Sequence, residues 1–339
     1  MVEAEPHSVA KRAVFWYNKV SNMNTKFKKI LTIGINKFAL DSAYWQRIEA
    51  LTEKIVNCDK DSPEIKDELT DTDCLLTGFG IVVNREMIDS SPNLRYIGVL
   101  ATAYGKVNVD YAKSKGISIC NIPGYATEAV AEFVFGVILD HIREIERGKK
   151  QAREGNYSEA GFSAIEIKDK VFGILGLGRI GSRVAEIALG FGADVRYWNI
   201  DRRKEFEERG IKYEDADNLI PKCDFLSLHF AQVKDTENFL NGERIQKIKK
   251  GAFVVNTAPM ELVDIDALAA RLSIGDMTFI LDHSDEMSQE NINKLSKFKN
   301  CIIYPPIAYI TKEARIAKQE IFVGNIESFL KGLPTNQVN

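Results

Sequence analysis

The sequence lacks the features that mark membrane, nucleic-acid-binding and secreted proteins. No apolar run in its 339 residues reaches the roughly 18 residues that a transmembrane helix needs. Glu3 and Glu5 stand where a secretory signal would carry basic residues. The 45 Lys and Arg residues are scattered among 48 Asp and Glu residues, and the net charge is -3. We therefore expect neither a membrane span nor a nucleic-acid partner.

Cysteine and histidine are also scarce. The five cysteines are Cys58, Cys74, Cys120, Cys223 and Cys301. Their wide spacing without a C-x-x-C pair favours buried, reduced thiols over a disulfide framework or a zinc site. We therefore expect a cytoplasmic protein without a metal centre. The four histidines, which are the natural proton carriers near neutral pH, are His7, His141, His229 and His283.

Residues 171–181, VFGILGLGRIG, are typical of a buried strand that enters a glycine turn and then a helix. Gly176 allows the tight turn, Gly178 lets the backbone approach a pyrophosphate, and Gly181 permits close packing of helix on strand. The helix N-terminus supplies free N–H groups. An ordinary glycine-rich turn is the alternative. The helical periodicity that follows and the second strand at 194–198 favour a dinucleotide site.

The rest of the chain from Lys29 onward alternates between strand and helix patterns, which predicts parallel sheets. Before the glycine motif, we expect strands at 30–35, 74–77, 94–100 and 117–122 and helices at 42–55, 85–89 and 110–115. A long apolar helix should follow from Thr127, which is placed to cap it, to about Arg153.

After a polar loop at 154–166 and the glycine motif, we expect further strands at 224–229, 252–256, 279–282 and 301–305. The pattern of a last helix at 312–331 could complete either domain. Residues 1–28 form an N-terminal extension whose apolar cluster, residues 14–17, could be a helix that docks on the body of the protein.

Several motifs along residues 29–330 occur in a characteristic order. They are Asn121-Ile-Pro-Gly-Tyr-Ala-Thr-Glu, Gly173 to Gly181, Leu228-His229, Val255-Asn-Thr-Ala258, Glu261-Leu-Val-Asp264, Asp282 and Pro305 before Ile307-Ala308. In this order the chain resembles the D-isomer-specific 2-hydroxyacid dehydrogenases. The resemblance implies an α/β fold of two doubly wound parallel-sheet domains, with the active site in the cleft between them.

The resemblance also implies how the domains and partners are arranged. A flavodoxin-like substrate domain would comprise residues 29–121 and 309–339, and a Rossmann coenzyme domain would comprise residues 122–308. The ligands would be a small-molecule substrate and NAD or NADP. Proteins of this family dimerise along the helix that begins at Thr127, so we expect a homodimer.

Residues that match the family's coenzyme site are intact. The resemblance implies that Gly178, Arg179, Ile180 and Gly181 hold the pyrophosphate with help from Thr236, that Ala258 and Asp282 lie near the nicotinamide carboxamide, and that His229 lies on the coenzyme side. Asn199 stands where an NAD enzyme carries an acidic residue for the adenosine ribose. Arg202, followed by Arg203 and Lys204, could meet a 2′-phosphate, which slightly favours NADP. A solvated helix start is the alternative.

The family's catalytic residues are not intact. Pro259 replaces the Arg that binds the substrate, and Met287 and Pro306 replace the Glu and His of the acid–base pair. Reduction of a 2-keto acid needs a cation for the carboxylate and a proton source. Loss of general acid catalysis costs roughly 10²–10⁴-fold in rate, and loss of an electrostatic clamp costs roughly 10²–10³-fold. We therefore expect simple 2-keto acids to be turned over hardly at all.

His283 is the candidate replacement for the lost acid. It follows Asp282 in a polar stretch that ends at Glu286, where a carboxylate could raise the pKa of the imidazole. The alternative is a loop histidine that merely pairs with Asp285. Tyr104 and Lys106 lie in the loop where the family presents backbone N–H groups to a carboxylate. Lys106 as an ordinary solvated lysine is the competing interpretation.

Three functions fit these observations. The favoured hypothesis is an oxidoreductase with a rebuilt active site, acting on a substrate other than a simple 2-keto or 2-hydroxy acid. The second is a catalytically silent, coenzyme-binding regulatory or scaffold protein. The third is a lyase or isomerase that retains its nucleotide. The polar stretch around His283 favours chemistry, whereas Pro259 and Pro306 favour silence, and the sequence leaves open whether the protein is an enzyme.

Overall fold

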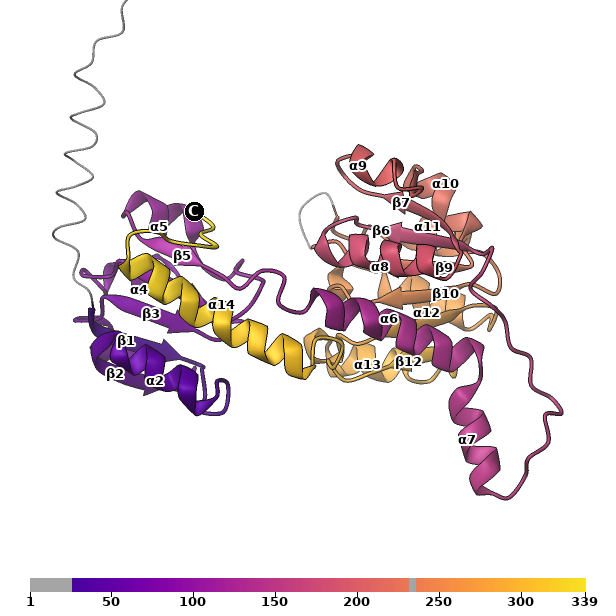
Figure 1. The fold of residues 1–339 in the computed structure, drawn as a ribbon, viewed down its shortest axis with the longest axis horizontal. Helices are drawn as coiled ribbons and strands as arrows, with labels where there is room; N and C mark the ends of the chain where they lie inside the picture. Colours follow the sequence, from indigo (N-terminus) through magenta and orange to yellow (C-terminus); the bar gives the residue numbers. More distant parts are fainter. Residues whose placement is uncertain (1–25, 232–235) are drawn as a thin grey trace, which may run out of the picture. The chain divides into compact units, whose positions relative to one another are not determined.

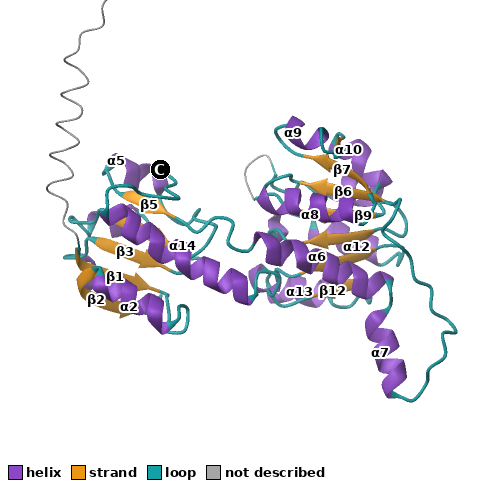
Figure 2. Cartoon of the chain, in the orientation of Figure 1, coloured by secondary structure: helices purple, strands orange, loops and turns teal. Residues whose placement is uncertain are grey.

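The computed structural model describes residues 26–231 and 236–339, which form two compact units (Figure 1). The first unit runs up to Tyr125 and resumes at Arg315–Asn339, and the second is Ala126–Ala314. Each unit is a parallel sheet with helices, so the predicted class of two doubly wound α/β domains is confirmed (Figure 2). The apolar cluster at 14–17 lies outside the described residues.

The first unit contains a five-stranded parallel sheet in the order β2-β1-β3-β4-β5, the flavodoxin-like order. Its strands are β1 (Phe27–Ile33), β2 (Thr52–Cys58), β3 (Cys74–Thr77), β4 (Tyr96–Val99) and β5 (Ser118–Cys120). Its helices are α2 (Ser42–Ala50), α3 (Ile65–Leu69), α4 (Arg85–Asp89), α5 (Val109–Ser114) and most of α14 (Lys312–Leu330). The strands β3 and β4 are buried throughout because helices cover both faces of the sheet.

The helix predicted over 42–55 is wrong in its second half. Helix α2 ends at Ala50, and Thr52–Cys58 forms the edge strand β2. This strand pairs with β1 along its whole length, from Phe27 opposite Thr52 to Ile33 opposite Cys58. The segment contains the β-branched residues Thr52, Ile55 and Val56, which suit a half-buried strand. The sequence prediction therefore missed a strand that begins only one residue after the end of a helix.

Helix α14 packs on the first unit, which settles the choice that its pattern left open. Its residues Phe322, Val323, Ile326 and Leu330 are buried in the same core cluster as Phe27. Near its start, Gln319 contacts Asp41, which follows the carboxyl end of β1. Near its end, Phe329 stacks on Phe27 at the beginning of β1. The helix therefore begins at the carboxyl edge of the sheet and runs to the amino edge (Figure 1).

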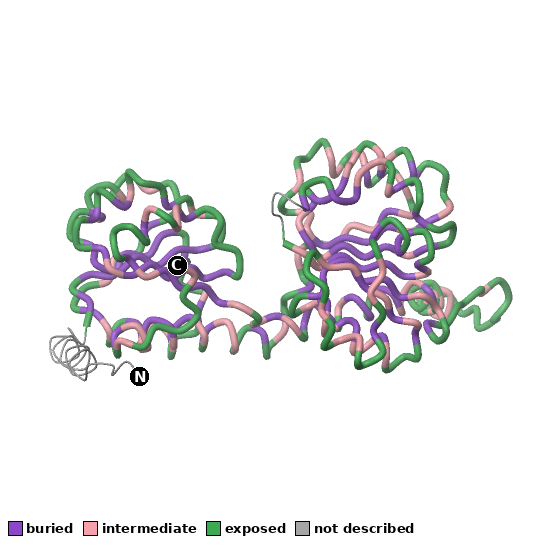
Figure 3. Tube along the Cα trace, turned by 90° about the horizontal axis from the view of Figure 1, so that it is seen from above, coloured by how far each residue is buried: buried purple, intermediate pink, exposed green. Residues whose placement is uncertain are grey.

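The second unit contains a seven-stranded parallel sheet in the Rossmann-type order β12-β11-β10-β9-β6-β7-β8. Its strands are β6 (Val171–Leu175), β7 (Asp194–Trp198), β8 (Lys212–Tyr213), β9 (Phe225–Leu228), β10 (Phe253–Asn256), β11 (Thr278–Leu281) and β12 (Cys301–Ile303). Its helices are α6 (Thr127–Ile142), α7 (Ile145–Arg153), α8 (Arg179–Gly190), α9 (Lys204–Glu207), α10 (Ala216–Leu219), α11 (Gly242–Lys247), α12 (Ile265–Leu272) and α13 (Gln289–Leu295), with short 3-10 turns η1 (Ile220–Lys222), η2 (Met260–Leu262) and η3 (Ser284–Glu286). Two clusters of buried apolar residues form the core between the sheet and its helices. The strands are largely buried (Figure 3).

The single helix predicted from Thr127 to about Arg153 is also wrong. It is two helices, α6 and α7, and its N-cap residue is Ala126 rather than Thr127. The break falls at Glu144, whose φ of 50° lies in the left-handed region, while its carboxylate accepts the Ser163 N–H at 2.8 Å. Helix α6 has a buried face, whereas α7 has no buried residue. Of the helices in the described ranges, none is long and apolar enough to cross a membrane.

Candidate functional site

The glycine turn after β6 has the geometry that its sequence predicts. Gly176 has a φ of +96°, which favours glycine over a residue with a side chain. A Cβ on Gly181 would lie 1.9 Å from the carbonyl oxygen of Gly176, so the first turn of α8 packs directly on the loop. Gly176 and Gly181 are therefore needed for the turn itself.

Gly178 differs, because a Cβ built there would meet nothing within 4 Å. It is the N-cap residue of α8, no side chain caps the helix, and the first turn carries no acidic residue. The backbone N–H groups of Arg179, Ile180 and Gly181, which have no helical acceptor, therefore begin a helix beside open space. This arrangement fits a pyrophosphate, since a helix N-terminus and its free N–H groups favour an anion.

Two polar side chains after β7, Asn199 and Arg202, make hydrogen bonds within the protein. Asn199 accepts the Leu177 N–H at 2.9 Å and donates to the Asp201 carbonyl oxygen at 2.9 Å, so its amide ties this strand end to the glycine turn. Arg202 makes two hydrogen bonds to Glu207, at 2.6 and 2.5 Å. Asn199 therefore acts here as a structural link, and Arg202 carries its own counter-ion.

A polar network crosses the carboxyl ends of β9 and β10. His229, just beyond β9, lies between two hydroxyl groups, with Nε2 at 2.7 Å from Ser227 Oγ and Nδ1 at 3.2 Å from Thr257 Oγ1. Burial lowers the pKa of His229 to about 3, so its ring is neutral. It can orient neighbouring groups, but it holds no spare proton near neutral pH. Farther along the chain, the Thr236 hydroxyl donates to the Ala231 carbonyl oxygen at 2.7 Å.

His283 extends this network to the end of β11. Its Nε2 lies 3.1 Å from the Thr257 carbonyl oxygen, which can only accept, so this nitrogen carries a proton. Its Nδ1 lies 3.4 Å from a carboxylate oxygen of Glu286, and Nε2 lies 3.9 Å from Asp282. The alternative of a pair with Asp285 is wrong, because Glu286 is the partner on the one-turn 3-10 helix that follows.

The charges around His283 outweigh its burial. Burial lowers the pKa of the imidazole, but Glu286, Asp282 and the Thr257 carbonyl together raise it above its ordinary value. In turn, His283 lowers the pKa of Glu286. The site therefore holds an imidazole that stays protonated to higher pH than a free histidine.

Asp282 presents a buried carboxylate oxygen that makes no hydrogen bond to the described residues. Its Oδ2 accepts the Ala308 N–H at 3.1 Å, whereas its Oδ1 is buried and makes no hydrogen bond. Burial also raises the pKa of this carboxyl group. Ala258 lies at the end of the neighbouring strand β10, where its N–H donates to Asn256 Oδ1 at 3.1 Å. An amide group such as the nicotinamide carboxamide fits here, because its N–H would satisfy Asp282 Oδ1.

Pro259, Met287 and Pro306, which the sequence predicts to replace the family's catalytic residues, offer no ionisable group. Pro259 precedes the one-turn 3-10 helix η2, Met287 packs against the apolar core, and Pro306 is half-buried after β12. Among the described residues of the second unit, the network around His283 brings side chains that can move a proton to the carboxyl ends of β9, β10 and β11. Sequence reasoning named Glu286 in the polar stretch after His283 but missed Ser227 and Thr257 in that network. The signal that could have found these two is their place at adjacent strand ends, since parallel strands bring such ends to one edge.

Tyr104 and Lys106 belong to the first unit, in the exposed loop after β4. The loop is anchored through Thr102, whose carbonyl oxygen accepts from Asn121 Nδ2 at 2.7 Å and whose hydroxyl donates to Ile122. Phe79, in the loop after β3, is 61% exposed at the same edge of the sheet. Tyr104 and Lys106 are both accessible to solvent. They belong to the first unit, whereas the His283 network belongs to the second.

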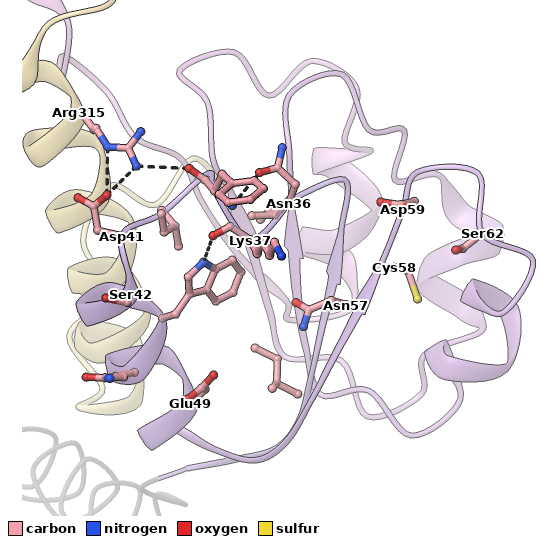
Figure 4. Close-up of a pocket in the computed structure, with 16 residues that line it drawn as sticks. Asn36, Lys37, Asp41, Ser42, Glu49, Asn57, Cys58, Asp59, Ser62 and Arg315 are labelled. Atoms are coloured by element: carbon pink, nitrogen blue, oxygen red, sulfur yellow. Dashed lines mark hydrogen bonds and ion pairs between the residues drawn. The ribbon is translucent and has the colours of Figure 1, made fainter.

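A hollow of about 1030 Å³ also opens in the first unit, between α2, the end of β2 and the start of α14 (Figure 4). Some of its polar groups bond to one another. Trp45 Nε1 donates to the Lys37 carbonyl oxygen at 3.1 Å, and Arg315 pairs with Asp41 at 2.6 Å. None of the site residues predicted from the sequence lines this hollow.

Known proteins resemble this chain in sequence and in fold. Residues 135–308 match the family model described as D-isomer specific 2-hydroxyacid dehydrogenase, NAD binding domain. A hydroxypyruvate reductase from Blautia hydrogenotrophica is 33% identical over 307 residues, covering 87% of this chain and 94% of that protein. A glyoxylate reductase from Thermofilum pendens is 33% identical over 297 residues, covering 84% of this chain and 88% of that protein.

Two solved structures show the same fold. A D-lactate dehydrogenase from Aquifex aeolicus, complexed with NAD and lactic acid, has a TM-score of 0.78 and 27% identity, covering 89% of this chain and 96% of that chain. An acyclic imino acid reductase, Bsp5, in complex with NADPH and D-Arg, has a TM-score of 0.80 and 28% identity, covering 92% of this chain and all of that chain, 100%.

Proposed function

Because the chain belongs to the D-isomer-specific 2-hydroxyacid dehydrogenase family, whose coenzyme is NAD or NADP, we propose that it is an oxidoreductase with a rebuilt acid–base site. Its substrate would be a carbonyl or imine compound other than a simple 2-keto acid. The observation that carries the proposal is the His283–Glu286 pair at the carboxyl end of β11, in a site where Pro259 and Pro306 supply no charge.

The coenzyme residues would act through the geometry described above. The N-terminus of α8 would hold the pyrophosphate over Gly178, and Asp282 Oδ1 would accept from the nicotinamide carboxamide. When bound, the reduced coenzyme supplies a hydride to the carbon of a C=O or C=N group. The first unit would then be the substrate domain, and the second the coenzyme domain.

His283 would hold the proton that completes a reduction. Its raised pKa keeps the ring protonated to higher pH than in a free histidine, and Glu286 positions it. Both nitrogens are turned toward protein groups, Nε2 to Thr257 and Nδ1 to Glu286. Delivery of the proton to a substrate atom therefore goes with a rotation of the His283 side chain away from Thr257.

The protein would also form a homodimer in the cytoplasm. Helix α7 has no buried residue within the chain, and Ile145 at its start is 44% exposed. This surface is the continuation of the helix along which the family dimerises. The five cysteines are free and buried, which accords with a reducing compartment.

A coenzyme-consumption screen tests the proposed function. We would supply NADH and NADPH with a panel of aldehydes, ketones, imines and keto acids. The panel includes imino acids, because the similar structure of Bsp5 is that of an acyclic imino acid reductase. For the substrate that is turned over, His283→Ala should abolish turnover and leave nucleotide affinity within a few-fold, because the pyrophosphate contacts lie at α8. An unchanged rate in His283→Ala would move the proton donor to Tyr104, Lys106 or Tyr309.

Two observations favour a second candidate, a catalytically silent coenzyme-binding protein. Both His283 nitrogens face groups of the protein itself, and the three replaced positions remove the family's charges. Such a protein would bind NADH or NADPH and consume neither with any compound of the panel. That result would replace the oxidoreductase proposal with the silent one.

A further inference from the structure

Residues 335–339, called the tail below, lie beside β5 at the edge of the first unit's sheet (Figure 1). The Val338 N–H donates to the Ile119 carbonyl oxygen at 2.9 Å, and Asn339 Oδ1 accepts the Ile119 N–H at 3.0 Å. The Asn339 side chain also donates to the Ile117 carbonyl oxygen at 2.6 Å. Strand β5 is the last strand in the order of the sheet, so these bonds cover part of a sheet edge. They also fix the place of the tail against the first unit.

The start of the tail bonds to one buried side chain of α14, that of Asn325. This residue is 2% exposed. Its Oδ1 accepts two hydrogen bonds, from the Thr335 hydroxyl at 2.9 Å and from Asn336 Nδ2 at 2.8 Å. Asn336 has a φ of 53°, in the left-handed region that asparagine adopts more readily than most residues with a side chain. The tail therefore uses both lone pairs of a buried amide oxygen.

Asn325 connects the tail to the loop after β4. Its Nδ2 donates to the Asn121 carbonyl oxygen at 2.8 Å. The Asn121 side chain donates in turn to the Thr102 carbonyl oxygen at 2.7 Å, and the Asn121 N–H donates to the Asn336 carbonyl oxygen at 3.3 Å. The Thr102 hydroxyl donates to the Ile122 carbonyl oxygen at 3.1 Å. A continuous series of hydrogen bonds within the first unit therefore joins the tail to this loop.

We propose that the tail positions the loop of residues 101–106, through Asn325 and Asn121, and thereby sets how tightly the loop binds substrate. This inference rests on the proposed function, in which the loop belongs to the substrate domain. Residues 102–106 are exposed and contribute little packing, so the bonds at the ends of the loop fix its conformation. Asn325 and Asn121 are buried, and an amide group there that loses its partner costs free energy. The network therefore favours one arrangement of the loop.

Two substitutions in the tail test the inference without any change in the loop. Thr335→Val combined with Asn336→Gly removes both donors to Asn325 Oδ1. Valine keeps the shape of threonine, and glycine adopts the positive φ at position 336 without strain. Thr335→Ser alone keeps the hydroxyl and should match the wild type. Gln337→Ala is the matched control, because the Gln337 side chain bonds to Asn339 within the tail.

Amide hydrogen exchange of the full-length protein is the first measurement, because it needs no substrate. The Val107 N–H donates to the Tyr104 carbonyl oxygen at 2.9 Å, and the Ile122 N–H donates to the Ala101 carbonyl oxygen at 3.2 Å, so both amides report on the loop. In the double variant their exchange should be about tenfold faster, because an unpaired buried acceptor favours locally open states. The amide of Leu75, in the buried strand β3, reports on the whole unit and should change by less than about twofold.

The second measurement uses the substrate found in the coenzyme-consumption screen. The double variant should raise KM by about tenfold and leave kcat within about twofold, because a loop that binds substrate and transition state equally affects binding alone. An unchanged KM would overturn the link between the tail and substrate binding.

The exchange result decides the positioning role by itself. If Val107 and Ile122 exchange no faster relative to Leu75 than in the wild type, or if Gln337→Ala gives the same response as the double variant, the tail only stabilises the first unit and the inference is overturned. A catalytically silent protein would still show selective loss of protection in the loop. Failure of this inference is therefore distinguishable from failure of the proposed oxidoreductase function.

Discussion

Replacement of Gly178 by alanine separates coenzyme binding from folding. The backbone there has a φ of -81° and a ψ of -158°, which alanine adopts without strain, and the new Cβ would meet no atom within 4 Å. The folded protein should therefore be unchanged or more stable by about 0.4–1 kcal/mol, because alanine restricts the unfolded chain. The new methyl group would fill the space that the pyrophosphate needs.

The loss of coenzyme affinity follows from the contacts that the methyl group displaces. Removing one or two hydrogen bonds to a charged group costs about 1.5–3 kcal/mol. This loss makes the dissociation constant roughly tenfold to hundredfold larger. Gly181→Ala is the matched contrast, because its Cβ would lie 1.9 Å from the Gly176 carbonyl oxygen. That clash forces α8 away from the turn and should cost about 1–3 kcal/mol of stability or more.

Thermal unfolding and fluorescence titration with NADH and NADPH distinguish the two variants. Gly178→Ala should keep its melting temperature and lose affinity, whereas Gly181→Ala should lose both. Wild-type affinity of Gly178→Ala for both nucleotides would refute the placement of the pyrophosphate over this turn. If the melting temperature of Gly178→Ala is as low as that of Gly181→Ala, the space beside Gly178 is not open.

Other predictions concern the charged pairs. Glu286→Gln should lower the pKa of His283, measured by NMR titration of its ring protons, because a carboxylate that favours the imidazolium is removed. The raised pKa means that His283 contributes stability below about pH 6.5, its unfolded value, and that this contribution is lost as pH rises through the folded pKa. The rate of a reduction should fall over the same rise in pH, and a flat profile would exclude His283 as the donor. Glu207→Gln should free Arg202 and raise affinity for NADPH relative to NADH in calorimetric titrations, and an unchanged ratio would leave Arg202 outside the adenosine site.

The sequence predicted the parts of the fold that depend on local pattern. Buried apolar strands such as Cys74–Thr77 and the turn from Gly176 to Gly181 combine residue type and spacing in one segment, so both were recognised. The edge strand Thr52–Cys58 was missed, because its pairing with β1 is not visible in its own alternation. The break at Glu144 was missed as well, since it depends on a distant contact with the Ser163 N–H.

The candidate site was predictable only in part for the same reason. His283 was found because it is next to Asp282 in the sequence, but the sequence left its partner open between Glu286 and Asp285. A one-turn 3-10 helix brings Glu286, three residues on, to the ring, and it leaves Asp285 outside. The link from His283 through Thr257 to His229 joins three strand ends that are 26 and 28 residues apart, and only the register of the sheet places them together.

The most direct test of the proposed rebuilt site is steady-state turnover of glyoxylate, pyruvate and hydroxypyruvate by the purified protein. The assay would follow NADH and NADPH oxidation after nucleotide binding has been verified by titration. Since Pro259, Met287 and Pro306 supply neither the clamp nor the acid, we predict that coenzyme binds and that none of the three keto acids is reduced at a measurable rate. Turnover within the common enzyme range of roughly 1–10³ per second would contradict this account of the active site.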